Sequence, residues 1–137
     1  MLPQDVAEGS IRATIAPWLS VQNGAQAVDF YYRAFGAVEV YRQEAPDGAV
    51  VARLVLQSSE FWISGASPSE EVAAREPVGG GTVRMILTVA DPDAIFQQAL
   101  SAGAKQVSPV REEYGWRVGR VEDPFGLHWE IGRPLHP

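Results

Sequence analysis

The sequence predicts an α+β fold in which two similar βαβββ modules stand in tandem and form a curled mixed sheet around a cleft. Two observations support this prediction. Strand and helix patterns follow the order β-α-β-β-β on each side of residues 66–81, a segment rich in Ser, Pro, Glu and Gly. The two halves also repeat at a spacing of 67 residues: eight of the thirty positions from 36 to 65 match their repeat partners, where average composition gives about two.

The length of the chain favours one domain. A chain of 137 residues is long enough to bury an adequate hydrophobic core. We therefore expect a single domain, residues 1–137, in which module one covers 11–65 and module two covers 82–134. The segment 66–81 between them is interpreted as a flexible linker.

Module one should contain one helix, which is marked by apolar residues at spacings of three, four and seven from Val28 to Phe35. Asn23 or Gly24 starts this helix, and Gly36 follows Phe35 directly and is typical of a helix C-terminus. Pro46-Asp47-Gly48 predicts a hairpin turn. The expected elements are a strand at Ile11–Val21, a helix at Ala25–Phe35, and strands at Val38–Ala45, Ala49–Leu56 and Glu60–Gly65.

Module two repeats this order. Asp91 is a good N-cap, Pro92 suits the first helical position, and Gly103 ends the helix. Asp123-Pro124-Phe125-Gly126 predicts a tight turn, because Asp accepts from nearby backbone N–H groups, Pro fixes φ and Gly permits a positive φ. The expected elements are a strand at Thr82–Val89, a helix at Pro92–Ala102, and strands at Gln106–Val110, Trp116–Glu122 and Leu127–Gly132.

Charge and composition exclude several classes of function. A net charge of −6 argues against nucleic acid or an anionic membrane surface as a partner. The absence of cysteine excludes disulfides, thiolate nucleophiles and Cys-ligated zinc. The apolar runs are too short to span a bilayer, and the first residues lack the pattern of a signal peptide. We therefore expect a cytoplasmic protein.

Two residues that follow the predicted turn of module two can carry chemistry. His128 and Glu130 are two positions apart, so on a strand both point to one face while Trp129 points to the other. An imidazole beside a carboxylate can form half of a metal site or an acid/base pair. Either use requires a further group from elsewhere in the chain.

Three segments resemble those of a known family: residues 16–37 (APWLSVQNGAQAVDFYYRAFGA), residues 84–104 (RMILTVADPDAIFQQALSAGA), and the hairpin in VEDPFGLHWEIG. Together with the repeat, they resemble the vicinal oxygen chelate superfamily of glyoxalase I, bleomycin-resistance proteins and extradiol dioxygenases. The chain is most similar to its small glyoxalase/bleomycin-resistance-like bacterial proteins, over residues 11–134. The resemblance implies the two-module fold. It leaves the activity open, because the family includes both enzymes and drug binders.

In its metal-dependent members, the resemblance implies a divalent cation held by four side chains, from the first and last strands of each module. Carried over to this chain, the four positions are Ala16, Ile63, Arg84 and Glu130. Only Glu130 can bind a metal, whereas a catalytic site needs about three protein ligands. We therefore expect no metal cofactor. The alternative is a rearranged divalent-metal site that includes Glu130 and His128.

Strand alternation then predicts an apolar and aromatic cleft that contains a few charged groups. Arg84 and Glu130 are expected to form a salt bridge; alternatively, Arg84 binds an anionic group of a ligand, oriented by Glu130 or His128. The expected ligand-binding residues are Trp18, Ser20, Phe61, Ile63, Arg84, Ile86, Trp116, His128 and Glu130.

Other prominent residues are expected outside the cleft. Trp62 and Trp129 should face the opposite side and pack under the helices. Arg117 and Arg120 are interpreted as surface or hairpin-bracing residues, since Arg53 is the repeat partner of Arg120.

The resulting hypothesis is a metal-free protein that binds a small aromatic or drug-like molecule, with no catalytic residue assigned. The alternatives are a metal-dependent lyase, isomerase or dioxygenase of the same superfamily, and a purely structural or regulatory module. A homodimer is expected in each case, because exposed sheet edges need covering and relatives of this size often complete their clefts across a dimer.

Overall fold

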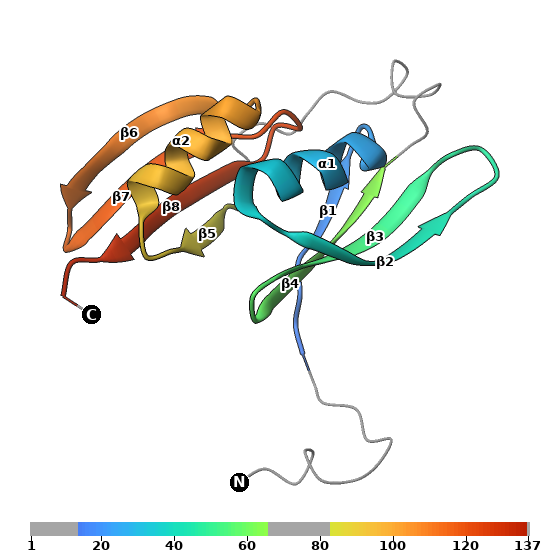
Figure 1. The fold of residues 1–137 in the computed structure, drawn as a ribbon, viewed down its shortest axis with the longest axis horizontal. Helices are drawn as coiled ribbons and strands as arrows, with labels where there is room; N and C mark the ends of the chain where they lie inside the picture. Colours follow the sequence, from blue (N-terminus) through green and yellow to red (C-terminus); the bar gives the residue numbers. More distant parts are fainter. Residues whose placement is uncertain (1–13, 66–82, 137) are drawn as a thin grey trace, which may run out of the picture.

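The computed structural model describes residues 14–65 and 83–136, and it confirms the α+β class and the two tandem modules (Figure 1). The expected linker at 66–81 lies outside the described residues. Module one consists of β1 (Trp18–Val21), α1 (Gly24–Phe35), β2 (Val38–Glu44), β3 (Val50–Leu56) and β4 (Ser59–Gly65). Module two consists of β5 (Met85–Thr88), α2 (Pro92–Ala102), β6 (Lys105–Glu113), β7 (Trp116–Glu122) and β8 (His128–Pro134).

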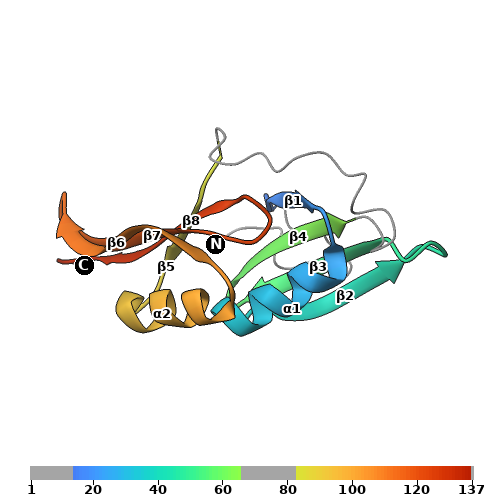
Figure 2. The same cartoon turned by 90° about the horizontal axis from the view of Figure 1, so that it is seen from above.

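Each module has its own open sheet. The described strands form two four-stranded mixed sheets, in the orders β1-β4-β3-β2 and β5-β8-β7-β6. The first strand of each module pairs in parallel with the last, and the other pairs are antiparallel. Both helices lie on the same side of the sheets, and the opposite faces are left without a helix (Figure 2). We refer to these opposite faces as the open faces.

The helices begin and end where their capping residues predict. The side chain of Asn23 accepts from the backbone N–H of Gln26 at 3.0 Å, and that of Asp91 accepts from Ala94 at 3.1 Å. Gly36 adopts the left-handed conformation, with φ of 80°, after the last turn of α1. In the described residues, no helix has the length and apolar character needed to cross a membrane.

Strand ends differ more from expectation than helix ends. In the described part of the strand expected at Ile11–Val21, only β1 is a strand. β5 is shorter than the expected Thr82–Val89, and β6 extends beyond the expected Val110 to Glu113. Prediction of such ends is weak because strand limits depend on the partner strand as well as on local sequence.

A buried hydrogen-bond cluster joins the two modules. Asp123, in the turn between β7 and β8, accepts at Oδ2 from the Tyr31 hydroxyl of α1 at 2.6 Å and from Trp129 Nε1 at 2.9 Å. Its Oδ1 accepts from the backbone N–H groups of Phe125 and Leu127, both at 2.9 Å. Burial raises the pKa of the Asp123 carboxyl above its usual value, while these hydrogen bonds act to lower it. Burial, followed by the nearby carboxylate, raises the pKa of Tyr31.

The turn between the last two strands is one residue longer in module two, and this changes which face the last strand presents. In module one Val55 pairs with Glu60, whereas its repeat equivalent, Glu122, pairs with His128. The repeat spacing is therefore 67 residues in β3 and 68 in β4. Because side chains alternate along a strand, an offset of one residue exchanges the two faces.

The predicted facing of β4 is consequently wrong. Phe61 and Ile63 were expected in the cleft, but they are buried under α1, with exposed fractions of 6% and 0%. Phe61 nevertheless lines a second pocket, of about 1340 Å³, together with Arg84 and Ile86. They occupy the positions that Trp129 and Ile131 occupy in module two. Trp129 lies in the core as expected. Trp62 does not lie under the helix, since it is placed on the open face and stacks on Trp18.

Candidate functional site

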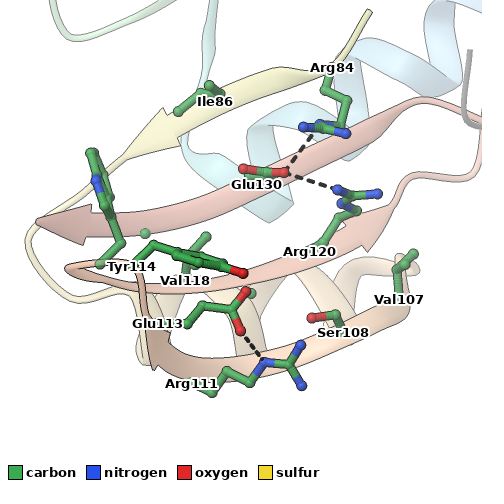
Figure 3. Close-up of a pocket in the computed structure, with 13 residues that line it drawn as sticks. Arg84, Ile86, Val107, Ser108, Arg111, Glu113, Tyr114, Val118, Arg120 and Glu130 are labelled. Atoms are coloured by element: carbon green, nitrogen blue, oxygen red, sulfur yellow. Dashed lines mark hydrogen bonds and ion pairs between the residues drawn. The ribbon is translucent and has the colours of Figure 1, made fainter. Parts of the chain in front are cut away.

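A pocket of about 730 Å³ lies on the open face of module two (Figure 3). All four strands of the sheet contribute to it, together with Arg84 just before β5 and the β6–β7 turn. Side chains at alternate positions of β7 face it, as the two-residue period of a strand requires. The lining residues are Arg84, Ile86, Val107, Ser108, Arg111, Glu113, Tyr114, Trp116, Val118, Gly119, Arg120, Glu130 and Gly132.

A cluster of two arginines and one carboxylate lies in this pocket (Figure 3). Arg84 Nε is 3.1 Å from Glu130 Oε2, which confirms the expected salt bridge. Arg120 Nη2 donates to the same oxygen, also at 3.1 Å. Strand pairing brings the groups together, since Arg120 and Ile86 flank Glu130 on neighbouring strands. The carboxylate is about three-quarters buried, which favours charged partners.

Sequence reasoning missed Arg120, because its likeness to Arg53 suggested a hairpin-bracing role. Arg53 does pair with Glu60 across its own hairpin at 3.1 Å. The available signal was strand parity: Trp116 was a predicted ligand-binding residue, and Arg120 is four positions further along the same strand. Arg117 has the opposite parity and binds Asp93 of α2 with two hydrogen bonds of 2.7 Å. It also lies 3.8 Å from Glu112 across the β6–β7 hairpin, in line with the expected bracing role.

The Arg120–Glu130 contact should contribute little to stability. Both side chains keep some contact with solvent, with exposed fractions of 30% and 25%. We therefore expect Arg120→Gln to lower the free energy of unfolding by about 1 kcal/mol or less. Urea unfolding followed by circular dichroism would measure this, with Arg33→Gln on the surface of α1 as the control. A loss of several kcal/mol would show that the pair has a structural function.

The remaining predicted site residues do not meet in this pocket. Trp18 and Ser20 lie on the open face of module one, where Trp18 is 54% exposed and donates from Nε1 to Ser64 Oγ at 2.9 Å. His128 lies at the start of β8 and does not line the pocket. The pocket therefore brings together Arg84, Ile86, Trp116 and Glu130 of the predicted set.

The open face of module one carries aromatic rings beside the Arg53–Glu60 ion pair. Trp18 and Trp62 stack with ring centroids 5.9 Å apart, and Tyr41 contacts Trp62 edge-on at 5.8 Å. The guanidinium of Arg53 lies 5.8 Å from the centre of the Trp62 ring, within the range of a cation–π contact. The two modules share one fold but present different chemistry on their open faces.

Comparison with known proteins decides the family. A model of the Glyoxalase/Bleomycin resistance protein/Dioxygenase superfamily matches residues 12–131. The chain belongs to this superfamily. The uncharacterised protein Mb0911c of Mycobacterium bovis, a relative, is 37% identical over 131 residues, which cover 92% of this chain and 86% of the relative.

Solved structures share the fold of this superfamily member. TioX from Micromonospora sp. ML1 has a TM-score of 0.69 and 26% identity, covering 90% of this chain and 100% of TioX. The fosfomycin resistance protein FosX from Listeria monocytogenes, complexed with Mn(II) and sulfate, has a TM-score of 0.68 and 11% identity, covering 90% and 93%. At the latter identity the likeness shows the fold alone.

The metal site of metal-dependent superfamily members does not fit this chain. With the corrected pairing, the four implied positions are Ala16, Trp62, Arg84 and Glu130. The one-residue offset in β4 replaces Ile63 by Trp62, which also lacks donor atoms suited to a metal. Two guanidinium groups already contact the Glu130 carboxylate. Among the described residues, no group of three or more His, Cys, Asp or Glu side chains is arranged to hold a metal ion.

Proposed function

We propose that this superfamily member binds a small aromatic or drug-like molecule without a metal ion. The observation that supports this most directly is the cluster at Glu130, where Arg84 and Arg120 contact the carboxylate and disfavour a further cation. The surrounding pocket of about 730 Å³ has the size of a drug-binding site. Tyr114 and Trp116 add aromatic surface to its lining.

Elemental analysis of protein purified without a metal-chelating tag tests the metal-free part of the proposal. We expect neither the wild type nor Glu130→Ala to contain near-stoichiometric Zn, Ni, Mn or Fe, because the arginines repel a cation at this position. Metal present in the wild type and lost in the variant would contradict the proposal.

That contradicting result would favour the second candidate function, a metal-dependent lyase, isomerase or dioxygenase with a rearranged site at Glu130 and His128. One observation supports this candidate. His128 Nδ1 is buried and has no hydrogen-bond partner among the described residues. An imidazole nitrogen in that state can accept a proton or bind a cation.

Ligand binding tests the other part of the proposal. We expect planar aromatic compounds to bind, and Trp116→Phe to weaken their binding about threefold to tenfold by removing aromatic area from the pocket. Isothermal titration calorimetry measures this, and Trp18→Phe on the other sheet is the matched control. An equal loss in the two variants would contradict a site confined to module two.

We further propose a cytoplasmic homodimer. β1 and β5 are edge strands of their sheets, and open edges of this kind favour association. Large apolar side chains such as Val38 and Val40, 51% and 49% exposed on the edge strand β2, add to the surface that a second copy would cover. Light scattering coupled to size-exclusion chromatography tests this, and a monomer at micromolar concentration would contradict it.

A further inference from the structure

We propose that the ligand of the module-two pocket is an organic anion, specifically an aromatic carboxylate whose charged group lies between Arg84 and Arg120. This inference rests on the proposed function and names the class of molecule that the same pocket takes. In this proposal Glu130 is neither a metal ligand nor a base. It is the group that holds the two guanidinium groups in place for the incoming anion.

The first argument is the charge of the pocket. Its lining contains three arginines, Arg84, Arg111 and Arg120, and two carboxylates, Glu113 and Glu130, which leaves 3 − 2 = +1. The whole chain, in contrast, carries −6. Arg111 and Glu113 pair with each other at 2.9 Å, so the excess positive charge lies at the cluster of two arginines and one carboxylate. A local positive charge in an acidic protein favours entry of an anion.

The second argument is the number of available donors. A guanidinium group carries five N–H donors in a planar fork. Arg84 contacts Glu130 through Nε, and Arg120 contacts it through Nη2. Within residues 14–65 and 83–136 neither arginine has another hydrogen-bond or ion-pair partner. The remaining donors suit a carboxylate, which binds such a fork through two parallel hydrogen bonds.

The third argument concerns the rest of the ligand. Ile86 and Val118 line the pocket beside the charged cluster, and Tyr114 and Trp116 add aromatic rings. Such walls favour a flat apolar body attached to the anionic group. An aromatic cation fits less well. Two arginines would repel it, and the one carboxylate that could attract it is already paired with both of them.

Replacing Glu130 is expected to change the affinity for an aromatic carboxylate in a direction that distinguishes this proposal from a metal or cation site. Its carboxylate organises the arginines but also repels a bound anion. We expect Glu130→Gln to bind an aromatic carboxylate at least about threefold more tightly, because the amide oxygen still accepts a hydrogen bond while the negative charge is gone. A metal site or a cation site at Glu130 would give the opposite sign.

The test compares three aromatic carboxylates, benzoate, 2-naphthoate and anthracene-9-carboxylate, with their neutral primary amides by isothermal titration calorimetry of the full chain. For at least one pair we expect the carboxylate to bind about tenfold more tightly than the amide. Arg84→Gln and Arg120→Gln should each remove most of that preference, because each variant weakens binding of the carboxylate more than binding of the amide. Arg33→Gln, which removes an arginine from the surface of α1, should change neither affinity.

The possible outcomes separate this inference from the proposed function. Equal affinity of carboxylate and amide, or unchanged preference in both pocket variants, would overturn the inference and leave the small-molecule function standing. Weaker carboxylate binding by Glu130→Gln would also overturn it. If none of the six compounds binds at about 1 mM, both the inference and the proposed function fail. Increasing salt should weaken carboxylate binding and leave the amides unaffected.

Discussion

Replacing Asp123 by alanine is expected to lower the free energy of unfolding by about 3–5 kcal/mol. The carboxylate accepts four hydrogen bonds, from Tyr31, Trp129 and the backbone N–H groups of Phe125 and Leu127. Its loss leaves buried donors without an acceptor, and each such group costs about 1–3 kcal/mol. The effects are not additive, so the total is smaller than the sum of four separate losses.

Urea unfolding followed by both tryptophan fluorescence and circular dichroism measures this effect. Asp29→Ala is the matched control, because it also removes a carboxylate but from an exposed ion pair on α1. Tyr31→Phe should cost less than Asp123→Ala, since it removes one donor and leaves the acceptor satisfied by the others. A loss below about 1 kcal/mol in Asp123→Ala would contradict a structural role for the cluster.

The second large effect is expected for Gly65→Ala, at about 3 kcal/mol. A β-carbon at Gly65 would overlap the backbone nitrogen of Gly24 and lie 2.6 Å from its α-carbon. It would also lie 2.9 Å from the carbonyl carbon of Asn23, the N-cap of α1. These contacts are all with backbone, which cannot rotate away as a side chain can, so the start of α1 must shift.

Thermal and urea unfolding of Gly65→Ala measure the cost. Ser59→Ala is a suitable control, because it introduces the same residue at an exposed position of the same strand, β4. The helix content at low temperature should stay close to that of the wild type if the shift is local. A free energy of unfolding equal to that of the control would show that the backbone there can move apart without cost.

Much of the fold could be predicted from short-range signals. Asn23, Asp91 and Gly36 determine where the helices begin or end through hydrogen bonds made within a few residues, and such bonds can be predicted from local sequence. The order of elements was likewise predicted from local strand and helix patterns, and the repeat supported it. The face to which each β4 side chain points was not predicted, because it depends on the length of the β3–β4 turn. Aligning the two halves at a constant spacing of 67 did not reveal that this turn is one residue shorter than the β7–β8 turn.

The candidate site was predicted only in part for a related reason. The contact between Arg84 and Glu130 could be expected, because the resemblance placed both residues at ligand positions of the family's metal site, on the first and last strands of module two. Arg120 was assigned a hairpin-bracing role by analogy with Arg53. The analogy did not consider which residue lies opposite each arginine on the neighbouring strand. Arg53 is paired with Trp62 in its sheet, whereas Arg120 is paired with Glu130. The partner across the strand, rather than the repeated residue itself, determines the chemistry.

The longer turn of module two also limits how this protein could be redesigned. The tryptophan of β4 is a surface ring and that of β8 is a core residue, although both occupy the same place in the repeated sequence. Copying the ionic pocket residue by residue into the first half would therefore bury charges and expose core side chains. An engineer who wanted two equivalent pockets would either copy β8 into β4 at a spacing of 68 residues, which places Glu130 at Trp62, or lengthen the β3–β4 turn by one residue and copy at 67.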